Sequence, residues 1–504
     1  MEWQPSSLEE QRLEKLAELR RQGVEPYPTA AGRSHTNAAA TAAFVEAEAE
    51  GNDGPAVVVA GRLVSLRDMG KTVFADLEDE SGRLQLFLRR GEVDEAAHQR
   101  FRKLIDLGDI IQANGLLFRT RLGEISVRVQ SWSLLSKAIS PLPVAKEQDV
   151  DGELRRFSAF ADVEERYRQR YADLAVNPEV REVFRIRARL VAALRHFLDQ
   201  HGFLEVETPV MQPLYGGAAA RPFVTYHNQL KQELYLRISF ELYLKRLLVG
   251  GLERVYEIGR DFRNEGVDAT HNPEFTQLEF YAAYWDYTDV MAFTEQMVAA
   301  AAQEVLGSTQ LTFQGQTSEL APPWPRLKLR DAIRQFTEID YMEHPTAEAL
   351  AAAIRDIGGH TPAGASWGKL IDGLLGDFVE ERLLQPTFIL DYPRDISPLA
   401  KLLPDDPSHV QRFEFFIGGM EMGNAFTELN DPQEQRARLE EMQRLHAADS
   451  EEAHPIDEDY LRAMRYGMPP NGGFGMGVDR LAMLLADRPT IRDVLLFPHL
   501  RERE

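Results

Sequence analysis

Residues 255–287, VYEIGRDFRNEGVDATHNPEFTQLEFYAAYWDY, carry the clearest structural signal in the chain. Two runs of apolar and aromatic residues flank a short polar loop, in which Gly266 and the pair Asn272 and Pro273 mark a turn. We therefore predict two paired antiparallel strands. Arg263 beside a carboxylate and an aromatic ring suits a nucleotide, because a guanidinium grips phosphate in bidentate fashion and a ring offers a stacking face. The alternative is a hairpin whose charged tip is merely solvated.

Composition limits the class of protein. A chain of 504 residues is too long for one core, so two or three domains are expected. It contains no cysteine, which excludes disulfides, thiolate zinc sites and cysteine nucleophiles. The charged N-terminus does not read as a signal peptide, and no run reaches the roughly 18–20 apolar residues of a membrane span, so we expect a cytoplasmic protein with no membrane partner. With a net charge of −23, any RNA must be bound through local positive patches.

Changes in composition and in the pattern of apolar residues along the chain predict its domains. Residues 1–54 are expected to form a charged helix and a linker with a short helix. Short alternating strands with one helix at 55–143 predict an OB-fold β-barrel. The remainder, 160–504, is expected to be an α+β domain whose antiparallel sheet is flanked by helices, with a helical insertion around 330–383.

Two further segments of the larger domain carry strong patterns. A helix opened by Asn177 and stopped at Gly202 is followed by FLEVETPVM (203–211), predicted as a strand. The glycine-rich NGGFGMGVDRLAMLLAD (471–487) predicts a strand that runs into an apolar helix. Its glycines let a ligand approach the backbone, and Arg480 could meet a phosphate at the helix N-terminus. The G-x-G-x-x-G spacing of a Rossmann turn is absent.

Carboxylates recur at strand positions in this domain. One such glutamate is usually an exposed strand residue, whereas five of them, together with arginines in glycine-rich settings, suggest magnesium, ATP and a cationic substrate. The five are Glu241, Glu279, Glu414, Glu421 and Glu428. Neither a plausible hydrolytic triad nor a histidine pair at metal spacing accompanies them.

Taken together, three stretches resemble motifs 1, 2 and 3 of the class II aminoacyl-tRNA synthetases: the helix with FLEVETPV, the hairpin with FRNEG and HNPEFTQLEFY, and GFGMGVDRL. Other segments are similar to the lysyl-tRNA synthetase family in particular: GGAAARPF (216–223), ELYLKRL (241–247), RQRYADL (168–174), ISPLAK (396–401) and NAFTELND (424–431). The resemblance extends from about residue 57 to the C-terminus. It implies ATP-dependent activation of L-lysine to lysyl-adenylate, transfer of the lysyl group to the 3′ end of tRNA(Lys), and, through motif 1, a homodimer.

The resemblance also implies a role for each matching residue. The implied catalytic residues are Arg263 and Arg480. The implied ATP-binding set is Arg263, Glu265, His271, Asn272, Phe275, Glu414 and Arg480, with Glu414 and Glu421 as ligands of Mg²⁺. The implied lysine-binding set is Gly217, Glu241, Glu279, Tyr281, Asn424, Phe426 and Glu428. In the barrel, Phe74, Gln85 and Glu124 would read the anticodon.

Several alternatives stay open. A related synthetase for aspartate or asparagine is disfavoured, because an aspartate site must offer a cation whereas Glu279 and Glu428 offer the paired anions that a buried ammonium needs. A paralog that lysylates a protein would lack the barrel, and a catalytically inactive tRNA-binding scaffold would lack motif residues. Ser239 and Phe240 depart from the Ala-Pro pair usual in the family, which puts the placement of Glu241 in doubt.

Overall fold

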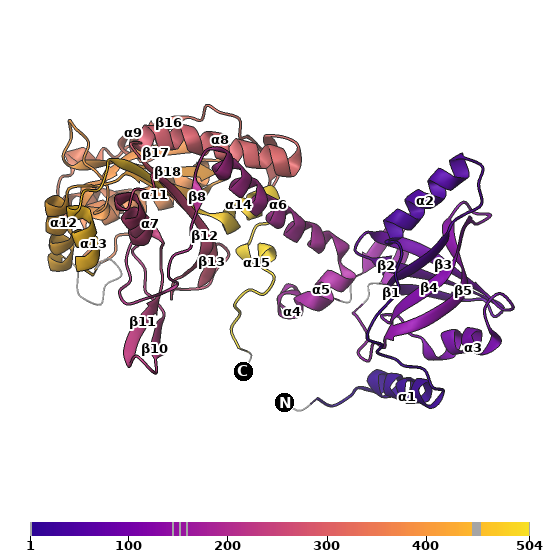
Figure 1. The fold of residues 1–504 in the computed structure, drawn as a ribbon. Helices are drawn as coiled ribbons and strands as arrows, with labels where there is room; N and C mark the ends of the chain where they lie inside the picture. The colour runs from indigo at the N-terminus through magenta and orange to yellow at the C-terminus, as the bar shows by residue number, and fades with distance from the viewer. Residues whose placement is uncertain (1–2, 144–145, 151–152, 158–159, 446–454, 503–504) are drawn as a thin grey trace. The chain divides into compact units, whose positions relative to one another are not determined.

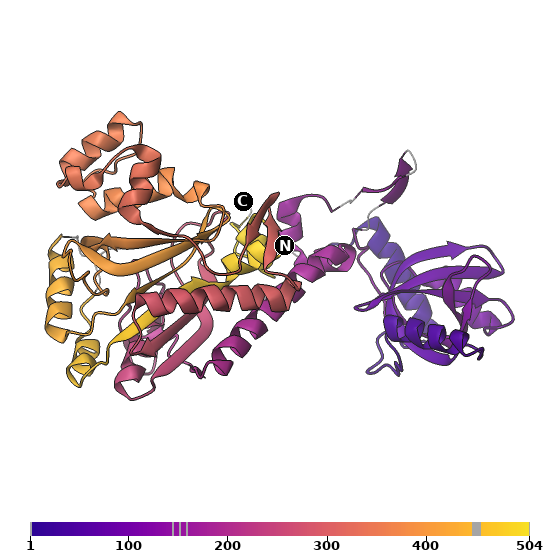
Figure 2. The same cartoon turned by 90° about the horizontal axis from the view of Figure 1, so that it is seen from above.

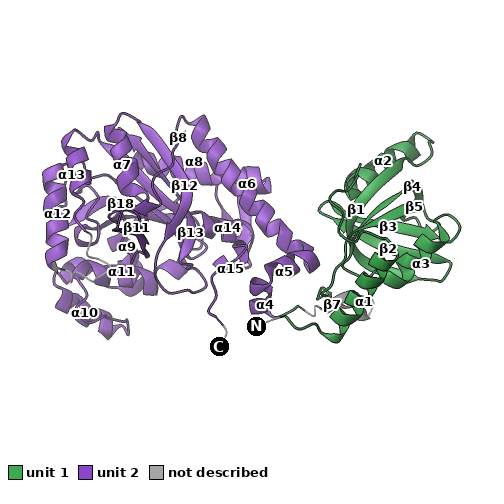
Figure 3. Cartoon of the chain, turned by 60° about the horizontal axis from the view of Figure 1, so that its bottom comes forward, with its two compact units in different colours: residues 1–161 green, residues 162–504 purple. Residues whose placement is uncertain are grey.

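The computed structural model describes residues 3–143, 146–150, 153–157, 160–445 and 455–502. The chain forms two compact units, residues 1–161 and 162–504 (Figure 3), and each unit has its own hydrophobic core. Among the described residues, no helix combines the length and apolar character that crossing a bilayer requires.

The smaller unit contains a closed barrel of five strands in the order β1-β2-β3-β5-β4 (Figure 1). The strands are β1 (Ala56–Asp68), β2 (Thr72–Asp79), β3 (Gly82–Arg89), β4 (Ile110–Arg119) and β5 (Ile125–Ser136). Neighbours are antiparallel except β3 and β5, which are parallel. Alternate residues of β2, namely Val73, Ala75 and Leu77, are fully buried, because successive side chains of a strand point to opposite faces. The predicted OB-fold barrel is confirmed.

Helices cover parts of this barrel. They are α1 (Ser7–Arg21), α2 (Asn37–Ala49) and α3 (Glu95–Leu104). Arg12 on α1 donates to the carbonyl oxygens of Ala138 and Leu107 at 2.9 and 3.0 Å, and Lys15 lies 2.5 Å from the Asp106 carboxylate. The N-terminal helix is therefore fastened to its own unit. A two-stranded sheet follows the barrel, formed by β6 (Lys146–Val150) and β7 (Glu153–Phe157).

The larger unit is built on an eight-stranded sheet in the order β16-β17-β18-β19-β20-β13-β12-β8. Its strands are β8 (Leu204–Glu205), β12 (Arg254–Phe262), β13 (Glu274–Ala283), β16 (Arg326–Lys328), β17 (Thr387–Pro393), β18 (His409–Ile417), β19 (Met420–Thr427) and β20 (Asn471–Gly477). The predicted hairpin is the pair β12 and β13. The central strands are antiparallel, as expected, and the edge pairs β16/β17 and β12/β8 are parallel.

One face of this sheet packs against helices and the other carries the polar side chains. The main core lies between the sheet and α6 (Pro178–Gln200), α8 (Tyr287–Leu306) and α14 (Val478–Leu485). On β13, Leu278 and Phe280 enter this core, so Glu279 and Tyr281 point to the opposite face. That face also carries α7 (Glu241–Val249), which packs against α13 (Glu458–Arg465).

Smaller elements surround the sheet. Residues 329–382 hold α9 (Leu329–Thr337), α10 (Ala347–Asp356) and α11 (Trp367–Phe378), which gather beyond the β16–β17 edge (Figure 2). Two small sheets are formed by β9 (Met211–Gln212), β10 (Val224–His227) and β11 (Gln232–Leu236), and by β14 (Gln310–Phe313) and β15 (Gln316–Glu319). The remaining helices are α4 (Val163–Arg168), α5 (Arg170–Val176), α12 (Pro432–Leu445) and α15 (Ile491–Val494).

The segment 203–211 is not the single strand that its sequence predicted. It contributes β8 to the large sheet and the first residue of β9 to the three-stranded sheet. Between them, Thr208 donates from its backbone nitrogen and its hydroxyl to the Glu257 carboxylate at 3.0 and 2.7 Å. Pro209 follows, and it has no N–H to offer a ladder. These two residues end the pairing and redirect the chain.

Candidate active site

Two adjoining cavities open on the polar face of the large sheet. They measure about 240 and 260 Å³. Four residues line both of them: Arg263, Gln277, Asn424 and Gly475. A ligand in one cavity can therefore meet a ligand in the other beside Arg263.

The first cavity gathers the whole predicted lysine-binding set. Its lining includes Gly217, Glu241, Glu279, Tyr281, Asn424, Phe426 and Glu428. These residues come from the turn before β10, from α7, from β13 and from β19 with the residue just beyond it. They meet because β13, β20 and β19 are adjacent in the sheet.

Bare backbone forms part of the wall of this cavity. Gly473 and Gly475 on β20 line it, while Phe474 and Met476, which alternate with them, are buried in the core. A Cβ atom added to Gly473 would lie 2.0 Å from Glu428 Oε1 and 2.4 Å from the Tyr281 ring. The cavity therefore needs glycine at this position.

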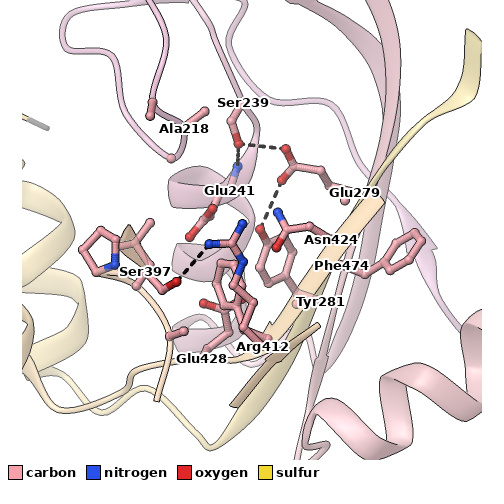
Figure 4. A pocket seen from close by; sticks show the side chains of 18 of the residues that line it. Ala218, Ser239, Glu241, Glu279, Tyr281, Ser397, Arg412, Asn424, Glu428 and Phe474 are labelled. Atoms are coloured by element: carbon pink, nitrogen blue, oxygen red, sulfur yellow. Dashed lines mark hydrogen bonds between the residues drawn. The ribbon is translucent and has the colours of Figure 1, made fainter. Parts of the chain in front are cut away.

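Glu279 is held by four donors, and Figure 4 shows two of these hydrogen bonds, from Ser239 and from Tyr281. Its Oε1 accepts hydrogen bonds from Ser239 Oγ at 2.7 Å, from the Phe240 backbone nitrogen at 3.2 Å and from Gln277 Nε2 at 3.0 Å. Its Oε2 accepts one from the Tyr281 hydroxyl at 3.1 Å. Burial, and then the charge of a neighbouring carboxylate, raise the pKa of Glu279 to about 7, although these hydrogen bonds act in the opposite direction.

Glu241 and Glu428 share a buried cation, Lys245. Its Nζ donates to Glu241 Oε1 at 2.6 Å and to Glu428 Oε2 at 2.5 Å. Burial acts to lower the pKa of Lys245, but the two carboxylates raise it well above its usual value. The other oxygen of Glu428, Oε1, is buried and has no hydrogen-bond partner among the described residues. The same holds for Asn424 Oδ1. Unpaired acceptors in an acidic cavity call for a ligand with N–H donors.

Arg412 and Glu414 lie next to this site. Arg412 lines the first cavity and donates to Ser397 Oγ at 2.9 Å and to Glu414 Oε1 at 2.6 Å, while the Tyr392 hydroxyl donates to Glu414 Oε2 at 2.8 Å. Burial raises the pKa of Glu414 to about 8; Arg412 lowers it, and the nearby charge of Glu421 adds to the rise. Glu414 belongs to neither lining, unlike the other residues predicted to bind ATP.

The second cavity contains the other predicted ATP-binding residues and Glu421: Arg263, Glu265, His271, Asn272, Phe275, Glu421 and Arg480. The Arg263 guanidinium lies over the Phe275 ring, 5.1 Å from its centroid. Arg480 donates to the backbone oxygen of Glu421 at 2.5 Å and lies 3.2 Å from His271 Nε2. Cations and one aromatic ring thus surround a space suited to phosphates and a base.

Glu414 and Glu421 are the two carboxylates predicted to bind Mg²⁺. Within the described residues, no group of three or more His, Cys, Asp or Glu side chains is placed to hold a metal alone. In phosphate sites, however, Mg²⁺ takes one or two carboxylates together with substrate phosphates and water. Glu421 has a partly exposed carboxylate in the second cavity, and its charge raises the pKa of Glu414. Each Glu414 oxygen accepts one hydrogen bond and retains a further lone pair, so the two carboxylates fit the ion.

On the barrel, two of the three predicted anticodon-binding residues lie together. Phe74 and Gln85 are on the outer face of β2 and β3, where the Phe87 ring lies 5.3 Å from Phe74. Ser126 donates to Gln85 Oε1 at 2.9 Å. Glu124 is exposed in the loop that enters β5, two residues before Ser126. The aromatic row continues from Phe87 to Phe118, which sequence reasoning did not single out.

Sequence reasoning also missed three residues of the first cavity or its rim. Lys245 follows Glu241 by four positions, and a Glu–Lys pair at this spacing on a helix is a recognisable signal. Arg412 precedes Glu414 by two positions on β18, which puts both side chains on one face of the strand. Ser239 was noted only as a departure from a familiar pattern, and nothing local indicated its bond to Glu279.

Comparison with known proteins gives two family matches. A model described as tRNA synthetases class II (D, K and N) matches residues 162–501, and one described as OB-fold nucleic acid binding domain matches residues 57–135. The lysine–tRNA ligase of Roseiflexus castenholzii is 52% identical over 500 residues, 99% of each chain. That of Chloroflexus aurantiacus is 51% identical over 499 residues, again 99% of each chain. That of Moorella thermoacetica is 51% identical over 493 residues, 98% of this chain and 97% of the relative.

Proposed function

The chain belongs to the class II tRNA synthetases of the D, K and N group, and on that premise we propose how its two cavities perform the reaction of a lysine–tRNA ligase. The activity joins lysine to tRNA at the expense of ATP. Lysine occupies the first cavity and ATP the second. The observation that carries the lysine assignment is Glu428 Oε1, a buried acceptor without a partner among the described residues, in a cavity lined by three glutamates.

We propose that the two ends of lysine meet different groups. The ε-ammonium donates to Glu428 Oε1 and lies near the Tyr281 hydroxyl. The α-ammonium pairs with Glu241, beside Gly217. Asn424 and Phe426 complete the walls around the alkyl chain. This orientation brings the lysine carboxylate to Arg263, which lines both cavities.

In the first step a lysine carboxylate oxygen attacks the α-phosphorus of ATP. A bond forms between that oxygen and phosphorus, and the bond to the bridging oxygen breaks as pyrophosphate leaves. Arg263 stabilises the charge on the α-phosphate, and Arg480 holds the departing phosphates. Phe275 stacks on the adenine, with Glu265, His271 and Asn272 around it. Catalysis then rests on positioning and charge stabilisation by fixed donors, with no protein nucleophile.

Glu414 and Glu421 are the residues that would hold Mg²⁺. When bound there, the ion neutralises part of the triphosphate charge. In the second step the terminal 3′-hydroxyl oxygen of tRNA attacks the lysyl carbonyl carbon and an ester bond forms. The bond from that carbon to the phosphate oxygen breaks, AMP leaves, and the hydroxyl proton passes to the departing phosphate.

We assign tRNA binding to the barrel at 55–143 and catalysis to residues 160–504, with 1–54 as an N-terminal extension and 330–383 as an insertion in the catalytic part. Phe74 offers a ring on which an anticodon base can stack, and Gln85 and Glu124 offer polar groups for its edge. The partner is tRNA(Lys), and the location that suits this work is the cytoplasm.

We further propose a homodimer formed through motif 1. Support comes from large apolar side chains left exposed around β8 to β11. Leu204, Met211, Val224, Tyr226 and Leu230 are all more than half exposed. Exposed apolar side chains can mark an interaction surface, and the two-fold dimer is the commonest soluble oligomer. Sedimentation equilibrium of wild type and Tyr226→Asp tests it: a wild-type monomer at micromolar concentration contradicts the proposal.

The experiment that tests the function is ATP–pyrophosphate exchange with each of the twenty amino acids, in the presence of Mg²⁺ and without tRNA. Exchange with lysine alone is expected. Exchange with aspartate or asparagine would overturn the assignment of the first cavity while leaving the family intact. Absence of exchange with every amino acid would overturn the proposed first step.

A further inference from the structure

Lys245 is a buried cation that the reaction described above does not use. Its side chain has no exposed surface, and its Nζ lies between the carboxylates of Glu241 and Glu428. The rings of Phe426 and Tyr460 approach the same ammonium, with centroids 5.8 and 5.7 Å away. An ammonium so enclosed keeps its position, because it is held by two anions and two ring faces.

Lys245 occupies one carboxylate oxygen of Glu241 and one of Glu428 and leaves the second oxygen of each to other partners. It binds Glu241 Oε1 and Glu428 Oε2, and Glu428 is left with one buried oxygen that has no partner among the described residues. This oxygen, Glu428 Oε1, lies next to Gly473 and the Tyr281 ring, both of which line the cavity.

We propose that Lys245 is a positioning residue for substrate selection, which holds Glu241 and Glu428 apart so that each offers an oxygen to a different ammonium of lysine. This inference rests on the proposed function, because it concerns how the same cavity chooses its substrate. It names the substrate class by charge: an amino acid whose side chain ends in a second cation.

The physical reason is the charge of the cavity. Glu241, Glu279 and Glu428 are all almost fully buried. Without a cation, buried carboxylates that lie close together cannot all stay ionised, and one of them takes up a proton. Burial raises the pKa of Glu241 and of Glu428, and Lys245 between them acts in the opposite direction, so it favours the ionised form of both carboxylates before lysine arrives. A charged Glu428 distinguishes the ε-ammonium from a methyl group, whereas a protonated one would not.

The alternative role for Lys245 is purely structural, as an ion pair that stabilises α7. A structural role predicts that a variant without Lys245 has a lower melting temperature. Once folded, that variant would keep the substrate preference of the wild type. Selection can be measured as the ratio of kcat/KM for lysine to that for norleucine, which is lysine without its ε-ammonium.

The test compares Lys245→Met with a matched control, Arg246→Met. Arg246 is the next residue of α7 and is also a paired cation, 2.5 Å from Asp457, outside the lining of either cavity. In pyrophosphate exchange, Lys245→Met is expected to raise KM for lysine at least tenfold while kcat changes by less than about threefold, so that the lysine-to-norleucine ratio falls at least tenfold. Arg246→Met is expected to keep that ratio.

A folded Lys245→Met protein, judged by its thermal transition, whose KM and ratio stay within twofold of wild type would overturn the proposal. An equal fall of the ratio in Arg246→Met would also overturn it. If Lys245→Met does not fold, Lys245→Gln is measured in its place with the same expectations. Wild type that fails to exchange with lysine refutes the proposed function itself, so the two failures are distinguishable.

Discussion

Replacing Ser239 by alanine removes one hydrogen bond from Glu279, a carboxylate that lines the cavity proposed to bind lysine. Ser239 is buried, and its hydroxyl donates to Glu279 Oε1 at 2.7 Å and accepts from the Glu241 backbone nitrogen at 3.1 Å. Alanine is smaller, so no clash follows. Gln277, the Phe240 nitrogen and the Tyr281 hydroxyl remain as donors to Glu279.

The size of the effect follows from the pKa of Glu279, which is about 7 in this site. A hydrogen bond to a charged group is worth about 1.5–3 kcal/mol, and about 1.4 kcal/mol corresponds to a tenfold change in a protonation equilibrium. The donor favours the ionised form, so its loss raises the pKa of Glu279, by about one if the lower figure applies. If only the ionised form binds lysine, KM rises about fivefold at pH 7, about ninefold at pH 6 and less than about 1.5-fold at pH 8.5.

The assay is pyrophosphate exchange at saturating ATP, with KM for lysine measured from pH 6 to 8.5 in wild type and Ser239→Ala. Ser408→Ala is the control, because Ser408 also donates to a carboxylate, Asp406, outside both cavities. A KM ratio that does not change with pH would refute the argument that Glu279 must be ionised. If the ratio of KM in Ser239→Ala to KM in wild type grew as pH rises, the argument that the substitution raises the pKa of Glu279 would be refuted.

Three other outcomes are expected. Glu428→Gln should lower kcat/KM for lysine exchange at least about a hundredfold, since a buried charge-assisted hydrogen bond is lost, whereas Glu295→Gln, at a buried carboxylate on α8, should leave it unchanged. Phe74→Ala should lower kcat/KM for tRNA charging about tenfold, the worth of one stacked base, and spare exchange; equal loss in both assays would contradict the anticodon role. The pKa of Glu414, about 8, lies above that of an unfolded glutamate, so the folded state retains its proton longer and this group costs stability as pH rises from about 5 to 8. By calorimetry without ligands, the melting temperature of wild type should therefore fall relative to Glu414→Gln over that range, and a constant difference would contradict it.

Local patterns were sufficient for the barrel and for the hairpin. Strand alternation of period two placed the buried residues of β2, and apolar runs on both sides of a polar loop predicted β12 and β13. The prediction of one strand over 203–211 was wrong, although the segment has strand-forming residues. Thr208 donates instead to the side chain of Glu257, which belongs to β12. A partner so distant in sequence has no local signature.

The same reason explains what was missed in the site. The predicted lysine-binding residues line one cavity, but their hydrogen-bonding state depends on residues far away in the chain. Lys245 and Glu428 are separated by 183 positions, and Ser239 and Glu279 by 40. Spacing on a helix can suggest the pair Glu241 and Lys245, yet it cannot reveal the second carboxylate on the same ammonium. The raised pKa of Glu279 and of Glu414 likewise follows from burial, which only the assembled sheet creates.

The bare strand β20 has a consequence for engineering. Because a Cβ atom at Gly473 would overlap both Glu428 and Tyr281, the cavity cannot be reshaped by adding a side chain at this position. Any redesign that admits a bulkier amino acid, such as an Nε-acylated one, must instead remove atoms from the opposing side chains. Tyr281 and Phe426 are the large groups available to trim. A library directed at those two positions, with Gly473 left unchanged, is thus the first design to try for new substrates.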